Sequence, residues 1–419
     1  MLASREVTCE MVTHSFVDAI EQREGDVHAF AWFEAGRAMN IARGFDNGKK
    51  VGPLRGLPVA VKDVIDTEGI ATEHGSPIYA GRIPGADAAC VALLRAAGGY
   101  VYGKTVTAEL ANFVPGPTRN PFALEHTPGG SSSGSAAAVA AHMAPFAIGT
   151  QTAGSVIRPA AFCGVVGFVP TRGTVPRAGV LRVSDTLDVI GSFANSVEDV
   201  ALLAAAVASR DDWAANAPTS APPVIAWTDT PWSDRLSPAM IDALKSVVRV
   251  CAEGASISEV SWPQKFVALA DAQRTVQVFE TARALAGEYD YHRSKLSSLL
   301  ATLIEEGRAI DPAVYQGALS TGRDCAAAID QLFGSADVVL APSASGEAPD
   351  GLGSTGDPQF NRAWQLLGGP QITVPVPRAL RASGADLPLG VQVIGRPHDD
   401  ARALRAAHWI EQHLNQASG

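Results

Sequence analysis

Hydrophobic and polar positions follow two alternating patterns along most of the chain. Short continuous apolar runs, typical of strands covered on both faces, occur at residues 57–65, 100–104, 189–193 and 337–342. Apolar residues at helical spacing, or residues of high helix propensity, fill positions 1–45, 88–99, 136–143 and 197–207. This alternation predicts an α/β fold, a single large domain with a mixed central sheet covered by helices on both faces.

Two serine-bearing glycine loops flank the Ala-rich helix predicted at residues 136–143. The first serine loop, residues 128–135, reads Pro-Gly-Gly-Ser-Ser-Ser-Gly-Ser, and the second serine loop, residues 149–155, reads Gly-Thr-Gln-Thr-Ala-Gly-Ser. A glycine-rich loop that enters a helix presents unpaired backbone N–H groups and the positive end of the helix dipole. Such a loop binds anions, either a phosphate or an oxyanion that forms during catalysis.

Two other interpretations of these loops agree less well with their surroundings. A flexible linker is disfavoured because apolar segments flank both loops closely. A phosphate-binding loop would carry a lysine directly after its last glycine, whereas Gly134 is followed by Ser135.

A single lysine interrupts the apolar run at residues 57–65. Taken alone, Lys62 beside Asp63 favours an ion pair at the edge of the sheet, with the ammonium group in solvent. The other interpretation is a buried lysine. Burial in an apolar pocket disfavours the charged form and would make the amine a base.

Taken together, the lysine and the two loops resemble the signature of the amidase signature hydrolases. That family has a Gly-Gly-Ser-Ser-Gly-Gly-Ser loop followed by a Gly-Ser-Ile-Arg loop, and it uses a Ser–cisSer–Lys triad. The resemblance implies that Lys62 is the base, Ser131 the bridging serine and Ser155, 24 residues further on, the nucleophile. It covers roughly residues 10–210 and 335–415, and it is weak between them.

The resemblance also implies the surroundings of the triad. The Gly130–Ser131 peptide bond is expected to be cis, and a second lysine, Lys104, is expected to be structural. The oxyanion of the tetrahedral intermediate would be held by four backbone N–H groups. These belong to Thr152, Ala153, Gly154 and Ser155.

The second serine loop departs from the usual family pattern in two ways. Gln151 stands where the family usually has an acid, and Arg158 follows the nucleophile by three residues instead of two. Both features, and the serine at position 133, are similar to malonamidase, a compact member that acts on the monoamide of a small dicarboxylic acid. We therefore expect Arg158 to bind a substrate carboxylate, with Thr150 and Gln151 beside it. The alternative is that Arg158 pairs with a distant acid or donates to a backbone carbonyl.

The pattern and the resemblance together divide the chain into four parts. Residues 1–50 are expected to form a helical wrap, and residues 51–210 a catalytic core that holds the lysine and both serine loops. Residues 211–334 are expected to be mostly helical and to form the substrate pocket, while residues 335–419 complete the core sheet. The Pro-, Ala- and Asn-rich segment 211–223 is the best candidate boundary.

Composition narrows the range of partners. Hydrophobic residues make up 47% of the 419 residues and charged residues 18%, values typical of a soluble enzyme with a large core. The net charge of −10 disfavours nucleic acid as a partner. Five scattered cysteines without a Cys-x-x-Cys pair predict neither a disulfide framework nor a zinc site. No signal peptide or membrane span is recognised, so we expect a cytoplasmic protein with no metal or cofactor and no membrane partner.

The leading function is hydrolysis of a small, carboxylate-bearing amide to a carboxylic acid and ammonia, by a chain that the resemblance suggests is a homodimer. The alternatives are an amidotransferase A-type subunit with glutaminase activity for tRNA-linked amidation, an amidase for neutral or aryl amides, and an inactive homologue. A Ser–His arrangement that uses His126 or His142, which flank the first serine loop, is a rival to the lysine.

Overall fold

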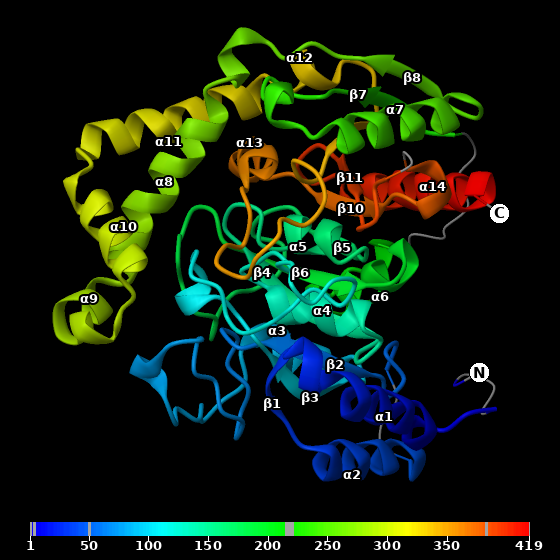
Figure 1. Cartoon of the computed structure of the whole chain (residues 1–419), viewed down its shortest axis with the longest axis vertical. Coiled ribbons are helices and arrows are strands. Elements are labelled where there is room, and N and C mark those ends of the chain that lie inside the picture. The colour runs from blue at the N-terminus through cyan, green and yellow to red at the C-terminus, as the bar shows by residue number, and fades with distance from the viewer. Residues whose placement is uncertain (1, 3–5, 49–51, 214–221, 382–383, 419) are drawn as a thin grey trace.

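The computed structural model describes residues 2, 6–48, 52–213, 222–381 and 384–418. Its centre is an 11-stranded mixed sheet in the order β1-β3-β2-β4-β6-β5-β10-β11-β9-β7-β8, which in Figure 1 runs from β1 at the bottom to β8 at the top. The strands are β1 Phe30–Phe33, β2 Pro58–Lys62, β3 Tyr100–Thr105, β4 Phe146–Gln151, β5 Val166–Val169, β6 Val189–Ala194, β7 Val224–Trp227, β8 Ser256–Glu259, β9 Val338–Pro342, β10 Gln371–Pro375 and β11 Gly390–Ile394. Strand β2 is parallel to β3 and β4, and β7 is parallel to β8 and β9, whereas the remaining pairs are antiparallel.

Helices cover both faces of this sheet, as the sequence predicts. They are α1 Cys9–Val27, α2 Ala35–Asp46, α3 Ala89–Ala96, α4 Ser133–Ala140, α5 Ile157–Phe162, α6 Val197–Ala208, α7 Pro238–Ala252, α8 Leu269–Ala284, α9 Ala286–His292, α10 Ser298–Ala309, α11 Pro312–Ala327, α12 Asp330–Phe333, α13 Gln359–Leu367 and α14 Asp400–Ser418. In β2, Val59 and Val61 pack in the cluster that contains α3, α6, α7 and α14. Ala60 packs in the cluster that contains α1, α2 and α4. Since side chains alternate along a strand, β2 is buried on both faces and its sequence is continuously apolar.

The N-terminal part differs from the prediction of continuous helices over residues 1–45. Residues Phe30–Phe33 form an edge strand that pairs antiparallel with β3, with Phe30 opposite Thr105. Helix α1 ends at His28, which has a φ of 52°, and the Glu24 carboxylate accepts the N–H groups of Ala29 and Phe30. The aromatic run Phe-Ala-Trp-Phe has high strand propensity. Its pairing with β3 outweighs the helical spacing of the apolar residues in this segment.

The middle part is mostly helical, as predicted, but it also extends the sheet. Strands β7 and β8 continue the sheet beyond β9, so they belong to the same layer as the C-terminal strands (Figure 1). Helices α8, α10 and α11 pack on one another, and α8 also packs against α13. Within the proposed boundary at 211–223, residues 214–221 lie outside the described residues.

Two expectations from composition, on disulfide bonds and on membrane spans, can be compared with the structure. All five cysteines are buried and none forms a disulfide. In the described parts of the chain, no helix is long and apolar enough to span a membrane.

Candidate active site

Lys62 is the last residue of β2 and is fully buried. Its Nζ donates to Ser131 Oγ at 2.8 Å and to Thr150 Oγ1 at 2.9 Å. The edge ion pair with Asp63 is therefore not formed. Asp63 instead lies 3.3 Å from Nζ of Lys104, the second buried lysine, which also donates to a carbonyl and a threonine hydroxyl in the neighbouring loop.

The environment of Lys62 favours its neutral form. Burial lowers the pKa of its ammonium group from the ordinary value of 10.5 to about 7, and the negative charge of Asp188 offsets part of this effect. Since both hydrogen-bond partners are hydroxyl groups, neither one fixes the positive charge. A large fraction of Lys62 is therefore neutral near pH 7, and the neutral amine can accept a proton from Ser131.

The first serine loop leads into α4 and presents Ser131 to Lys62. The Gly130–Ser131 peptide bond is cis, as the family resemblance implies, and Ser131 is 1% exposed. The carbonyl oxygen of Gly130 accepts a hydrogen bond from Nη2 of Arg158 at 2.6 Å. Ser131 is thus held by a hydrogen bond from Lys62, and the peptide bond before it by one from Arg158.

The second serine loop connects β4 to α5 and leaves Ser155 half-buried between buried neighbours. Ser132 holds the two serine loops side by side, because its N–H donates to the carbonyl of Ser155 at 3.3 Å and its Oγ to that of Thr150 at 3.1 Å. The Ser155 hydroxyl itself makes no hydrogen bond within the described residues, so the link from Ser131 to Ser155 is not formed here. Its partial exposure leaves Ser155 open to a substrate.

An acidic residue that the sequence analysis did not single out supports the second serine loop. The carboxylate of Asp188 accepts a hydrogen bond from Thr152 Oγ1 at 2.6 Å and also accepts the N–H groups of Val183 and Ser184. Burial raises the pKa of Asp188, and these hydrogen bonds act against that effect. The signal was present in the sequence, since Asp188 is a lone acid between Leu187 and the apolar run that follows it.

Gln151 is fully buried and both ends of its amide are used. Its Oε1 accepts the N–H groups of Val156 and Ile157 at the start of α5, at 2.9 and 3.1 Å. Its Nε2 donates to Gln365 Oε1 at 2.9 Å. The side chain therefore caps the first turn of α5 and ties it to α13.

Arg158 lies on α5 and is 2% exposed. Nε donates to the carbonyl of Thr355 at 2.7 Å and Nη2 to Thr355 Oγ1 at 3.2 Å, in addition to the bond with Gly130. Nη1 is buried and has no hydrogen-bond partner. Burial lowers the pKa of Arg158 to about 9, so the guanidinium group is charged at neutral pH.

The two histidines of the rival arrangement are not beside the serines. Nδ1 of His126 is paired with the carbonyl of Ala348 at 2.8 Å. His142 is exposed beyond the end of α4 and has a φ of 56°. Within the described residues, neither ring is hydrogen-bonded to Ser131 or Ser155, and no group of three or more side chains could hold a metal ion.

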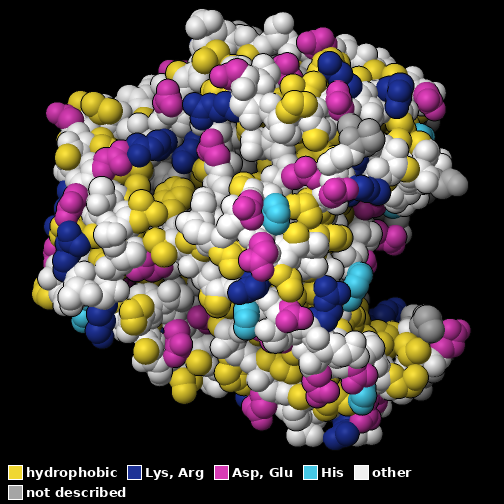
Figure 2. Space-filling view, viewed as in Figure 1, with side chains coloured by type: hydrophobic (Ala, Val, Ile, Leu, Met, Phe, Trp, Pro, Cys, Tyr) yellow, Lys and Arg dark blue, Asp and Glu magenta, His cyan; other side chains and the backbone are white. Residues whose placement is uncertain are grey.

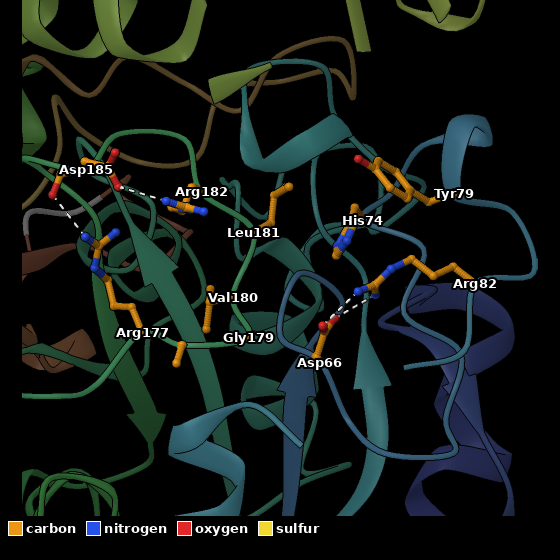
Figure 3. Close-up of a pocket in the computed structure, with 11 residues that line it drawn as sticks. Asp66, His74, Tyr79, Arg82, Arg177, Gly179, Val180, Leu181, Arg182 and Asp185 are labelled. Atoms are coloured by element: carbon orange, nitrogen blue, oxygen red, sulfur yellow. Dashed lines mark hydrogen bonds and ion pairs between the residues drawn. The ribbon is translucent and has the colours of Figure 1, made fainter. Parts of the chain in front are cut away.

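A cavity of about 550 Å³ is lined in part by Arg177, which contacts the carboxylate of Asp188, the residue that supports the second serine loop (Figure 3). One wall carries Asp66, His74 and Arg82, and the opposite wall carries residues 177–182 and Asp185. Arg82 and Asp66 form an ion pair at 2.6 Å across the first wall. Arg177, on the other wall, lies 3.5 Å from the Asp188 carboxylate, which is the link between this cavity and the second serine loop.

Comparisons with known proteins agree with this geometry. The family model described as Amidase matches residues 11–404. The A-type subunit of glutamyl-tRNA(Gln) amidotransferase from Koribacter versatilis is 32% identical over 473 residues, which cover 99% of this chain and 96% of that protein. The protein of the same name from Acidothermus cellulolyticus is 48% identical over 221 residues, 50% of this chain and 44% of that protein, so this match spans about half of either. A solved structure described as a crystal structure of amidase superposes with a TM-score of 0.89 at 26% identity, over 99% of this chain and 98% of that one.

The chain belongs to the amidase signature family. It is an amidase, an enzyme that hydrolyses the C–N bond of amides. The two relatives named above are amidotransferase subunits and not malonamidases, so the resemblance noted at the second serine loop is confirmed only as far as the family.

Proposed function

We propose that this amidase cleaves a small amide that carries a carboxylate, with Lys62, Ser131 and Ser155 as its triad. The observation that carries the triad is the pair of hydrogen bonds from a fully buried lysine to Ser131 and Thr150. Thr150 accepts from the same nitrogen as Ser131, so its role in this proposal is to orient the amine.

The reaction begins with two proton transfers. Ser155 Oγ gives its proton to Ser131 Oγ, and Ser131 gives its own proton to neutral Lys62. Ser155 Oγ then forms a bond to the amide carbon, and the carbonyl oxygen becomes an oxyanion. The backbone N–H groups at residues 152–155 stabilise this charge.

The second half of the reaction reverses these transfers. Ser131 donates a proton to the amide nitrogen and is reprotonated by Lys62, the C–N bond breaks, and ammonia leaves an acyl-enzyme on Ser155. Water then attacks the ester by the same relay. The products are a carboxylic acid and the free Ser155 hydroxyl.

The substrate class follows from Arg158. Its Nη1 is buried without a partner, and no Asp or Glu among the described residues lies within ion-pair distance of its guanidinium group. A buried positive charge without a counterion is costly, and a substrate carboxylate would supply one. Gln151 itself brings no negative charge to Arg158, and its amide is occupied in capping α5.

The substitution Arg158→Leu tests this assignment. We expect KM for malonamate, the monoamide of malonic acid, to rise on the order of 30-fold or more, because a buried charge loses its partner at a cost of about 2–5 kcal/mol. KM for acetoacetamide, a neutral amide of similar shape, should change far less. Thr355→Val is the matched control, since it removes one partner of the guanidinium group and keeps Nη1 and the charge. Equal losses on both amides would assign Arg158 to the scaffold.

A second candidate function is supported by the names of the relatives. The relative from Koribacter versatilis aligns with 99% of this chain, so a role as an amidotransferase subunit, with a partner protein and tRNA, is the alternative. The net charge of −10 argues against direct binding of tRNA by this chain.

Ammonia release by the purified chain separates the two functions. A free-standing amidase should release ammonia from malonamate without any partner protein. If the chain releases ammonia from glutamine but not from malonamate, and only after a partner protein is added, this would favour the amidotransferase subunit. The predicted homodimer is compatible with either function.

A further inference from the structure

The free edge of Arg158 faces a neutral side chain, that of Asn361 on α13. A Cβ atom placed on Gly154 would lie 3.1 Å from Nη1 of Arg158 and 2.3 Å from Oδ1 of Asn361. Both atoms therefore lie against the same side of Gly154, and their separation is no greater than the sum of these two distances. Nη1 and Oδ1 are both buried without a hydrogen-bond partner, so the two groups are close but not bonded to each other.

The amide of Asn361 is held in one orientation. Asn361 is fully buried, and its Nδ2 donates to the carbonyl of Ser343 at 2.9 Å. Nε2 of Gln392 fixes the backbone on both sides of this link, because it donates to the carbonyls of Pro342 and Phe360. Since the nitrogen of Asn361 is used in this way, its oxygen is the atom that faces the guanidinium group.

Two charged groups influence the pKa of Arg158, and neither one neutralises it. Asp357 raises this pKa, but its side chain is half exposed and lies 3.4 Å from Arg235. Arg362 lowers it, and its own guanidinium group donates to two glutamines of α8. Asn361 adds only the dipole of its carbonyl group to the free edge of Arg158.

An acid at position 361 would change this balance. Asn and Asp side chains have the same shape, so a carboxylate here would face Nη1 of Arg158 as an internal counterion. The attraction between unit charges this close is strong in a buried site, and a substrate carboxylate would have to compete with it. The neutral amide attracts Nη1 without cancelling its charge.

We propose that Asn361 is a positioning residue that determines the specificity of this site for acidic amides. Its carbonyl oxygen orients the free edge of Arg158, and its neutrality leaves the positive charge for the carboxylate of the substrate. This inference rests on the proposed function and makes it more specific. It predicts that the charge at position 361 alters KM for acidic amides and leaves neutral amides unaffected.

The experiment compares Asn361→Asp and Asn361→Ala with the wild-type enzyme on malonamate and on acetoacetamide. Both variants lose the hydrogen bond to Ser343, but only Asn361→Asp adds a charge, so the difference between them isolates the charge. In Asn361→Asp, we expect KM for malonamate to rise on the order of 10-fold or more, as expected for a close buried charge pair. The rise should be smaller in Asn361→Ala. The kcat for malonamate and both constants for acetoacetamide should stay within a few-fold in either variant.

The pH profile supplies a second readout that a purely structural role would not move. Arg158 has a pKa of about 9, so binding of malonamate should weaken above that pH in the wild-type enzyme. A neighbouring carboxylate favours the charged guanidinium group, so this falling limb should move to higher pH in Asn361→Asp. It should stay in place in Asn361→Ala.

Other outcomes overturn the inference in distinguishable ways. If both variants change KM or kcat equally on the two amides, Asn361 only packs against Gly154. If Asn361→Asp does not fold, Asn361→Ala decides, because an unchanged KM for malonamate would exclude a positioning role. Loss of the acidic preference in Arg158→Leu but in neither Asn361 variant would reject this inference alone. A wild-type enzyme without any acidic preference would reject the proposed substrate class as well.

Discussion

At the residue scale, the site depends on one lysine whose charge is opposed by its surroundings. Lys62 has hydroxyl groups as its hydrogen-bond partners and is fully buried, and burial brings its pKa to about 7. Lys104 is also buried, but it lies 3.3 Å from the Asp63 carboxylate and has a pKa of about 8. The carboxylate partner favours the charged form of Lys104, whereas the hydroxyl partners of Lys62 leave it free to be neutral, as the proposed triad requires.

The lowered pKa values of Lys62 and Arg158 predict different pH profiles for acidic and for neutral amides. In the proposed mechanism Lys62 acts in its neutral form, so kcat/KM for any amide should rise with pH through about 7. In the proposed binding mode Arg158 contacts the substrate carboxylate in its charged form, so kcat/KM for malonamate should fall again above about 9, while that for acetoacetamide should not.

To test these pH profiles, rates on both amides are measured from about pH 5 to about pH 10.5 at constant ionic strength. Lys62→Ala should lose about 10²–10⁴ in kcat on both substrates. A rising limb centred well away from pH 7, or a falling limb shared by both amides, would contradict these assignments.

At the element scale, the second serine loop is held by elements that are distant in the sequence. Asp188, directly before β6, binds Thr152 Oγ1, while Gln273 on α8 binds the carbonyl of the same residue. Gln151, at the end of β4, caps α5 and contacts α13. A loop fixed at both ends is suited to stabilise an oxyanion, because its N–H groups need little reorganisation.

The substitution Asp188→Asn tests this support. It keeps the size of the side chain but places an amide NH2 among the N–H groups of Val183 and Ser184, so we expect a loss of about 1–3 kcal/mol of stability and a lower kcat. Removal of the carboxylate also removes the charge that raises the pKa of Lys62, so the rising limb should move to lower pH.

Arg177→Gln is the matched control, since it removes the contact at 3.5 Å and keeps the Asp188 charge. Thermal unfolding and the pH profile of kcat are the two readouts. A rising limb that does not move in Asp188→Asn would show that Asp188 has no electrostatic effect on the base.

The elements also show what the sequence could predict. The strands at 57–65, 100–104, 189–193 and 337–342 were predicted because a strand buried on both faces is a continuous apolar run. Strand β1 was missed, since its pairing with β3 involves residues more than 70 positions apart, from Phe30 to Thr105. Local periodicity contains no information about such a partner.

Prediction of the site had a similar limit. Lys62 and the two serine loops form recognisable local patterns, and the family resemblance predicted the contact between Lys62 and Ser131 and the cis bond that the structure shows. Gln273 was not predicted, because it contacts the carbonyl of Thr152 from α8, 121 positions further along the sequence. The hydrogen bond of the Gln151 amide could not be predicted either, because its partner Gln365 lies on a different element, α13. Residues that act through tertiary contacts leave no pattern in their own segment.

At the scale of the whole molecule, one sheet brings residues from most of the chain to one site. Lys62 comes from β2 and the serine loops from the segments that lead into α4 and out of β4, while Gln273, which contacts the second serine loop, comes from α8 (Figure 1). Figure 2 shows acidic and basic side chains interspersed over the visible face, without a broad basic area. This face therefore offers no broad basic area for direct binding of a polyanion.

The central claim is that Ser155 is the residue that becomes acylated, and a covalent probe tests it most directly. The enzyme is treated with a fluorophosphonate and digested, and the modified peptide is located by mass spectrometry, with Lys62→Ala as a parallel sample. We expect one adduct, on Ser155, and much slower labelling in the Lys62 variant because the nucleophile is no longer activated. An adduct on Ser131, or equally fast labelling without the lysine, would contradict the account.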